Sequence, residues 1–195
     1  MKYTLRLEYD PDVECPNSDY AWKLISFHRK HINYQSPEKF IKALDANGEV
    51  IPAEVGLREK LENGTAYILS YYEHGGCVWS LKGSGPQCRW DTAQIAGLLL
   101  WEGEAEDLPQ RLDQRREAAQ EFLQVYTKWA NGETHWYSLE DENGDIVDSC
   151  GGFLDDDDMF ENIRLVLREG DLVSVRGDAR FLANECNIKP ARLVR

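Results

Sequence analysis

The chain has 195 residues, of which 42% are hydrophobic and 11% aromatic, which is enough apolar mass to build a core and excludes global disorder. Its formal net charge of −13 disfavours direct binding to nucleic acid, because proteins that bind the phosphate backbone usually present a basic patch. The longest apolar run, residues 95–101, is far shorter than the roughly 20 residues that span a bilayer, and residues 1–10 lack the pattern of a signal peptide. We therefore expect a soluble cytoplasmic protein with no membrane partner. The five cysteines are widely spaced and form no Cys-x-x-Cys pair, so neither a disulfide framework nor a zinc finger is expected.

The first quarter of the chain combines a clear strand with less certain elements. Apolar and polar residues alternate over 2–9, which predicts a half-buried strand. Residues 21–34 are compatible with a strand or a short helix. A helix is predicted from Ser36, because serine caps helices and Pro37 suits the first helical position, with an apolar stripe that ends at Leu44. Asn47-Gly48 is predicted to end this helix.

The middle of the chain is predicted to alternate helices with a hairpin. A short helix is expected at 57–62, and the strands 65–72 and 77–81 are expected to be joined by a tight turn. Residues 95–101 are interpreted as a buried strand. Apolar residues recur every three or four positions between 107 and 129, which predicts the clearest helix of the chain.

The last third is predicted to contain a second hairpin and a final helix and strand. The strands 134–140 and 146–149 flank an Asn-Gly turn, which is typical of hairpins. Residues 159–170 have the pattern of an amphipathic helix, with aspartates before its N-terminus where the helix dipole favours them. Residues 171–177 are expected to form the last strand.

These elements predict an α+β fold, with a mainly antiparallel sheet and the long helix packed on one face. A core domain is expected at residues 1–154. A C-terminal helix–strand appendage is expected at residues 155–195, and it is compatible with being part of the same domain.

A histidine in the predicted hairpin turn is the first candidate for chemistry. His74 follows Glu73, and Asp91 lies on the next segment, so the three supply the groups for general acid–base catalysis. With His28 they would also resemble a metal ligand set, although the spacing names no ion, and no metal or cofactor is expected. The alternative is a turn histidine that hydrogen-bonds the backbone.

Three further sets of residues have both a functional and a structural interpretation. Cys150 lies beside two glycines, which permit the close backbone approach that a nucleophile needs, or it is a small buried side chain. Arg89, Trp90 and Gln94 would suit a small-ligand pocket. The basic and aromatic residues of 22–34 would suit stacking on a base, or belong to an ordinary strand.

Most of the negative charge belongs to one region. No Lys or Arg occurs between Lys128 and Arg164, whereas eleven acidic residues do; of the 35 acidic residues in the chain, 24 then remain against 22 basic ones. Such a region attracts a basic partner or mimics nucleic-acid phosphates, and its alternative is solvated surface. Calcium is not expected at 141–145, because Ile146 and Gly152 stand where a calcium loop needs Gly and Glu. The predicted partner-binding residues are Glu140, Asp141, Glu142, Asp145, Asp155, Asp156, Asp157, Asp158 and Glu161.

Four short segments, in order, resemble an uncharacterised family of small proteins encoded by tailed phages and other mobile elements. That family carries a Trp followed by His-Arg-Arg-Tyr, then Asp-His-Ser-Gly, Trp-Asp-Ser-Gly-Gln-Val-Gly and Asp-Ser-Cys-Trp-Gly-Phe. The matching segments here are Trp22 with residues 28–30, residues 73–76, residues 90–96 and residues 148–153. The likeness extends over about residues 1–155. Glu73 replaces the family's Asp and Gly75 its Ser, and Ala93 and Ala96 replace glycines, so a catalytic Asp-His pair would be altered here.

The resemblance implies no known activity, but it implies an accessory gene of a phage or mobile element. Together with the regional charge it leads to one hypothesis of function: an anti-CRISPR or antirestriction inhibitor. Such an inhibitor would bind a host protein or ribonucleoprotein complex through its acidic surface, without contacting nucleic acid. The alternative is a small hydrolase or nucleotide-processing enzyme that uses His74 and Asp91, with Glu73.

Overall fold

The structure is a computed structural model that describes residues 1–154, 156–177 and 192–193. The chain has an α+β fold with mostly antiparallel sheets, and its contacts divide it into two compact units. Unit 1 comprises Met1–Glu14 and Lys128–Arg195, and unit 2 comprises Cys15–Thr127.

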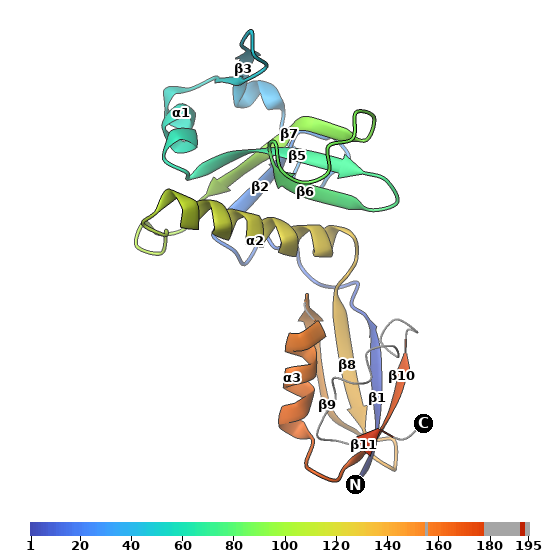
Figure 1. Cartoon of the computed structure of the whole chain (residues 1–195). Coiled ribbons are helices and arrows are strands. Elements are labelled where there is room, and N and C mark those ends of the chain that lie inside the picture. The colour runs from blue at the N-terminus through green and yellow to red at the C-terminus, as the bar shows by residue number, and fades with distance from the viewer. Residues whose placement is uncertain (155, 178–191, 194–195) are drawn as a thin grey trace. The chain divides into compact units, whose positions relative to one another are not determined.

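Unit 1 is built on a five-stranded sheet in the order β11-β10-β1-β8-β9 (Figure 1). Strand β1 pairs with β8 in antiparallel and with β10 in parallel register, so it lies at the centre. Its alternating pattern places Leu5 and Leu7 in the core, as the period of two in the sequence predicts. The strands are β1 (Lys2–Tyr9), β8 (His135–Glu140), β9 (Ile146–Phe153), β10 (Leu172–Gly177) and β11 (Arg192–Leu193).

Helix α3 (Asp156–Val166) covers one face of this sheet. Its residues Met159, Phe160 and Ile163 are fully buried and pack against the leucines of β1 and against Tyr137 and Leu139 of β8. The predicted final helix and strand are both present. The boundary predicted after residue 154 falls within unit 1, where α3 shares a core with β1 and β8.

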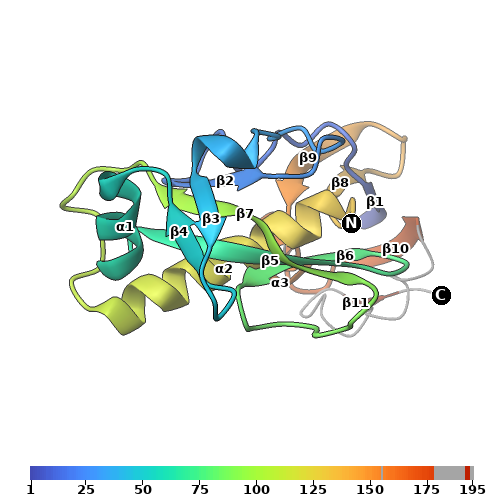
Figure 2. The same ribbon diagram turned by 90° about the horizontal axis from the view of Figure 1, so that it is seen from above.

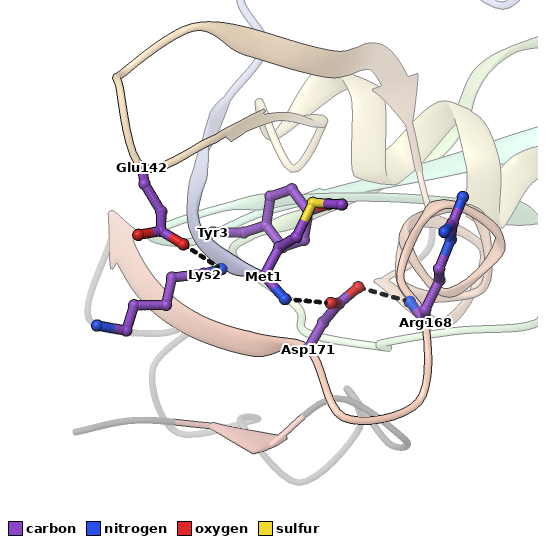
Figure 3. A network of polar contacts seen from close by, with 6 residues as sticks. All are labelled: Met1, Lys2, Tyr3, Glu142, Arg168 and Asp171. Atoms are coloured by element: carbon purple, nitrogen blue, oxygen red, sulfur yellow. Dashed lines mark hydrogen bonds and ion pairs between the residues drawn. The ribbon is translucent and has the colours of Figure 1, made fainter.

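The chain start is tied to the turn that follows α3 (Figure 3). The amino group of Met1 lies 2.8 Å from Asp171 Oδ1, and the backbone N–H of Arg168 donates to Asp171 Oδ2 at 2.9 Å. On the other side, the backbone N–H of Lys2 donates to Glu142 at 3.3 Å. The hydrogen bond with the amino group of Met1, and then that with the N–H of Arg168, lower the pKa of Asp171.

We expect Asp171→Asn to destabilise the protein at neutral pH but not in acid. Because the pKa of Asp171 is lower in the folded protein than its unfolded value of about 3.9, the contact stabilises above that pH. The stabilisation is lost as the pH falls through the folded pKa. Urea unfolding of both proteins at pH 7 and in a series below pH 4 would measure it. An equal difference in unfolding free energy at every pH would contradict this account.

Unit 2 is built on a four-stranded sheet in the order β2-β7-β5-β6, and Figure 1 shows helix α2 (Leu112–Ala130) along one face of it. The Tyr126 ring lies edge-on to Trp79 of β6, and the N–H of Trp79 donates to Thr127 Oγ1 at 3.0 Å. The predicted strands and long helix are therefore present. The strands are β2 (Trp22–Ser26), β5 (Ala66–Glu73), β6 (Cys77–Leu81) and β7 (Thr92–Trp101).

Helix α1 (Val55–Glu62) includes the predicted short helix and lies next to strand β4 (Val50–Pro52), as Figure 2 shows. Its one buried residue, Leu57, joins a core cluster with Ile25 and Leu98. Among the described residues, no helix has both the length and the apolar character needed to cross a membrane.

The helix predicted from Ser36 is wrong. A single 3₁₀ turn, η1 (Pro37–Lys39), is followed by β3 (Ile41–Leu44), which pairs with β4. The hydroxyl of Ser36 makes no capping bond to the backbone, and Leu44 is 52% exposed, so no helix face is buried. Instead the carboxylate of Asp45 accepts the N–H groups of Asn47 and Glu49, which closes a β-turn where the sequence suggested a helix end.

Helix α2 also begins later than predicted, at Leu112 and not at 107. Pro109 disfavours the helical conformation of the residue that precedes it, so the periodic pattern there does not extend the helix. The carbonyl of Pro109 accepts a hydrogen bond from Arg115 at 2.6 Å.

Candidate functional site

His74 and Asp91 are brought together in unit 2. The turn between β5 and β6 is closed by the N–H of His74, which donates to the Gly76 carbonyl at 3.0 Å. The backbone N–H of Glu73 donates to the Asp91 carbonyl at 3.0 Å, which holds the turn against the segment before β7. His74 Nδ1 then lies 3.5 Å from Asp91 Oδ2.

A third side chain, Cys88, completes this cluster and was not among the predicted site residues. Its Sγ lies 3.2 Å from the same Oδ2 of Asp91, and its N–H donates to Thr92 Oγ1 at 3.0 Å. The carboxylate therefore lies between the thiol and the imidazole. A cysteine nucleophile needs the imidazole itself as its base, so the geometry suits an imidazole oriented by a carboxylate and not a Cys-His pair. The His74 side chain is 72% exposed, which leaves it accessible to a reactant in solution.

Glu73 does not share this cluster through its side chain. Its carboxylate hydrogen-bonds the hydroxyl of Tyr71, whose pKa is raised by burial and then by the nearby Cys77 and Glu73. The ring centroids of Tyr71 and His31 are 4.9 Å apart, and Glu73 acts electrostatically on His31. The Glu73 carboxylate therefore lies on the side of Tyr71 and His31.

His31 is held in an aromatic pocket of unit 2. Its Nδ1 lies 2.8 Å from Ser26 Oγ, and its ring contacts His28 at 4.7 Å and Trp79 at 5.6 Å. Burial and then the charge of His28 lower the pKa of His31, whereas Glu73 opposes this. His28 thus groups with His31. Within the described ranges, no group of three or more His, Cys, Asp or Glu side chains is arranged so that it could hold a metal ion.

The other predicted sets are dispersed. Cys150 is an exposed residue of β9 and belongs to unit 1, whereas His74 belongs to unit 2. The guanidinium of Arg89 stacks 5.1 Å from the ring of Trp90, which is 82% exposed. Gln94 donates to the side chain of Gln87 at 2.8 Å.

The predicted acidic surface includes one cluster at the turn between β8 and β9. Asp141 Oδ1 accepts the N–H groups of Asn143 at 2.8 Å and Asp145 at 3.0 Å, and these bonds lower its pKa. Glu142 and Asp145 are exposed beside it. We call Asp141, Glu142 and Asp145 the tip cluster.

A second cluster lies on α3. Asp156, Asp157 and Asp158 occupy its first turn, where the helix dipole favours negative charge, and Glu161 is exposed one turn later. Asp156 Oδ1 lies 2.9 Å from Nδ1 of His135, the first residue of β8. We call these four residues the helix cluster. Asp155, also predicted to bind a partner, lies outside the described residues.

Strand β8 separates the two clusters, because Asp156 contacts its first residue and the tip cluster follows its last. Five residue steps of a strand correspond to roughly 17 Å. Two other acids of the region have partners within unit 1: Glu140 lies 2.8 Å from Arg6, and Asp148 accepts the Tyr137 hydroxyl at 2.5 Å. The contiguous acidic segment of the sequence is therefore two separate negative surfaces.

Comparison of the chain with protein-family models, curated proteins and solved structures finds no match, so the proposals below depend on the geometry of these sites.

Proposed function

We propose that the protein is a non-enzymatic inhibitor that binds a basic surface of a host nucleic-acid-targeting defence complex through unit 1. The carrying observation is the pair of acidic clusters at the two ends of β8, in a stretch of 35 positions without Lys or Arg. Two groups of negative charge at the ends of one strand present a basic partner with charge at a fixed separation. The resemblance to proteins of phages and mobile elements supports a partner of this class.

The tip cluster is suited to this role because its charge is held in place. Backbone hydrogen bonds fix Asp141, and their effect on its pKa keeps it ionised to lower pH than an ordinary aspartate. Glu142 and Asp145 therefore project from an ordered turn, and little conformational entropy is lost when a basic partner binds them. Charge of one sign also steers a basic partner toward this surface.

A plating assay tests this function. Strains that each carry one restriction or CRISPR system would express the protein and be challenged with a phage that the system restricts. We expect the wild type to restore plating in at least one strain. A charge variant with Glu142→Gln, Asp145→Asn, Asp157→Asn and Asp158→Asn should lose the effect. It spares Asp141, which holds the turn, and Asp156, which contacts His135.

The matched control changes four exposed acids of unit 2: Glu59, Glu62, Glu104 and Glu106 are each replaced with Gln. It loses the same net charge and should keep the wild-type effect. Equal activity of the charge variant and the wild type would rule out the acidic surface as the cause.

A hydrolase is the second candidate, and the contact of His74 with Asp91 is the observation that favours it. An imidazole oriented by a carboxylate acts as a general acid or base, which is worth about 10²–10⁴-fold in rate. If the wild type hydrolyses model esters or nucleotides, we expect His74→Ala to lower the rate of hydrolysis by at least about a hundredfold. The control variant is His28→Ala, which changes an exposed histidine of the same unit and should leave the rate of hydrolysis unchanged. A wild-type protein inactive on the panel, or an active His74→Ala variant, would eliminate this candidate.

A further inference from the structure

The chain contains four Asn-Gly pairs, and one of them has surroundings unlike those of the other three. In such a pair the glycine nitrogen can attack the side-chain amide of the asparagine, because no glycine side chain shields that nitrogen. In a folded protein the attack depends on whether the glycine N–H is held in a hydrogen bond and on how strongly the amide carbonyl is polarised. The pairs are residues 47–48, 63–64, 131–132 and 143–144.

In three of the pairs the glycine N–H donates to the backbone carbonyl three residues earlier. In two of these turns a carboxylate, that of Asp45 or Asp141, also accepts the N–H of the asparagine. Its negative charge opposes the loss of the glycine amide proton. The glycine N–H is therefore a poor nucleophile in these pairs. Gly48 donates to Asp45 at 3.0 Å, Gly132 to Trp129 at 2.9 Å and Gly144 to Asp141 at 3.1 Å.

The fourth pair, Asn63-Gly64, follows α1, and the helix end is closed without the glycine N–H. The N–H of Asn63 donates to the carbonyl of Glu59 at 2.9 Å, and the N–H of Thr65 to that of Lys60 at 2.9 Å. Within the part of the chain that the structure describes, the N–H of Gly64 donates to no backbone carbonyl or side chain. The nitrogen that would attack the amide is therefore not engaged.

The side-chain amide of Asn63 is polarised toward this attack. Its Oδ1 accepts the N–H of Thr65 at 3.0 Å and the hydroxyl of Thr65 at 2.7 Å. Two donors on one carbonyl oxygen make the carbon more electrophilic and stabilise the negative charge that the oxygen gains when a nucleophile adds. Asn63 is also exposed, so water reaches the product.

A guanidinium favours the loss of the Gly64 proton. Nη1 of Arg115 donates to the main-chain carbonyl oxygen of Asn63 at 2.6 Å. That oxygen and the Gly64 nitrogen belong to the same peptide group. When the nitrogen is deprotonated, its negative charge is therefore shared with an oxygen that lies beside a positive charge.

We infer that Asn63 is a site of spontaneous deamidation in the folded protein. The Gly64 nitrogen bonds to Cγ of Asn63, and the side-chain nitrogen leaves as ammonia with the Gly64 proton, which gives a cyclic imide. Water then opens the ring. Attack at Cγ gives aspartate in the normal chain, and attack at the main-chain carbonyl gives isoaspartate. Either product places a carboxylate near Arg115, and the reaction does not depend on the inhibitor function.

Peptide mass spectrometry of the full-length protein, incubated at neutral and mildly alkaline pH, tests this inference. The mass gained when NH₂ is exchanged for OH would be followed at all four Asn-Gly pairs of one sample. We expect residue 63 to deamidate at least about tenfold faster than the other three asparagines, because one hydrogen bond on the attacking nitrogen corresponds to roughly tenfold in rate. In guanidinium chloride, which removes the structure, the four rates should become similar. A rate at residue 63 no faster than the others in the folded protein overturns the inference.

Two matched pairs of variants connect the rate to these contacts. Thr65→Val removes the hydroxyl donor and should slow deamidation of Asn63 by about tenfold, whereas Thr65→Ser should keep the wild-type rate. Arg115→Gln should also slow it, whereas Arg116→Gln, which removes the same charge at an exposed position of α2, should not. The other three pairs report on the fold, because their rates would rise if a variant unfolded. Wild-type rates at residue 63 in both Thr65→Val and Arg115→Gln would overturn the inference.

Discussion

Phe160→Ala is expected to destabilise unit 1 by about 3–5 kcal/mol, the usual cost of removing a buried aromatic side chain. Phe160 is fully buried between α3 and the sheet, in one cluster with Leu5, Leu7 and Tyr137. A loss of this size is a large part of the roughly 5–15 kcal/mol that stabilises a typical domain. Urea unfolding, with hydrogen exchange of β1 and β8 as the local readout, would measure it.

The control is Leu165→Ala on the same helix, where the side chain is 81% exposed. Its effect on the unfolding free energy should stay within about 0.5 kcal/mol. If the segment after residue 154 were a dispensable appendage, Phe160→Ala would leave the exchange of β1 and β8 unchanged, which would contradict the shared core.

Neutralising either acidic cluster alone should weaken binding to the inhibited complex by roughly fivefold. Exposed charge pairs contribute about 0.2–1 kcal/mol each, so two lost charges correspond to roughly 1 kcal/mol. The half variants are Glu142→Gln with Asp145→Asn in the tip cluster, and Asp157→Asn with Asp158→Asn in the helix cluster. Their dissociation constants for the complex identified by plating would be compared with that of the wild type.

The two losses should multiply in the combined variant. The clusters are roughly 17 Å apart along β8, well beyond the Debye length of about 8 Å at physiological salt, so they act independently. If one half variant accounted for the whole loss, the partner would contact that end of β8 alone, and the two-cluster surface would be wrong.

Local patterns in the sequence predicted most elements of the fold. Period-two alternation identified β1, and the three-to-four residue period identified α2 and α3, because each of these elements buries one face. The failure at Ser36 has a local cause: the stripe up to Leu44 resembles a helix face, but a turn centred on Asp45 commits the segment to a β-ribbon. Asn47-Gly48 follows this stripe, and an Asn-Gly pair is typical both of a helix end and of a β-turn.

The sites were less accessible to sequence reasoning, because they depend on pairing across the sheets. The proximity of His74 to Asp91 follows from the β5–β7 pairing, whereas the side chain of Glu73, one residue earlier, joins Tyr71. Cys88 is only three residues from Asp91, so this contact had a local signal that a search for His and carboxylate pairs passes over.

In unit 1, too, the arrangement of the charged residues depends on strand pairing that the local sequence does not reveal. The acidic segment contains the hairpin of β8 and β9. The tip cluster and the helix cluster therefore follow one another in the sequence but lie at opposite ends of β8. Arg6 meets Glu140 only because β1 pairs with a strand more than a hundred residues away in the sequence. No local pattern identifies such a pair.

The most direct test of the acidic surface is the salt dependence of binding to the inhibited defence complex, measured for the wild type and the four-residue charge variant. We predict that the wild type binds more tightly at about 0.1 M salt and loses affinity steeply as salt approaches 1 M, because the Debye length falls from about 10 Å to about 3 Å. The charge variant should bind weakly throughout, with a flatter dependence. Equal affinities with the same salt dependence would show that the acidic clusters do not bind the partner.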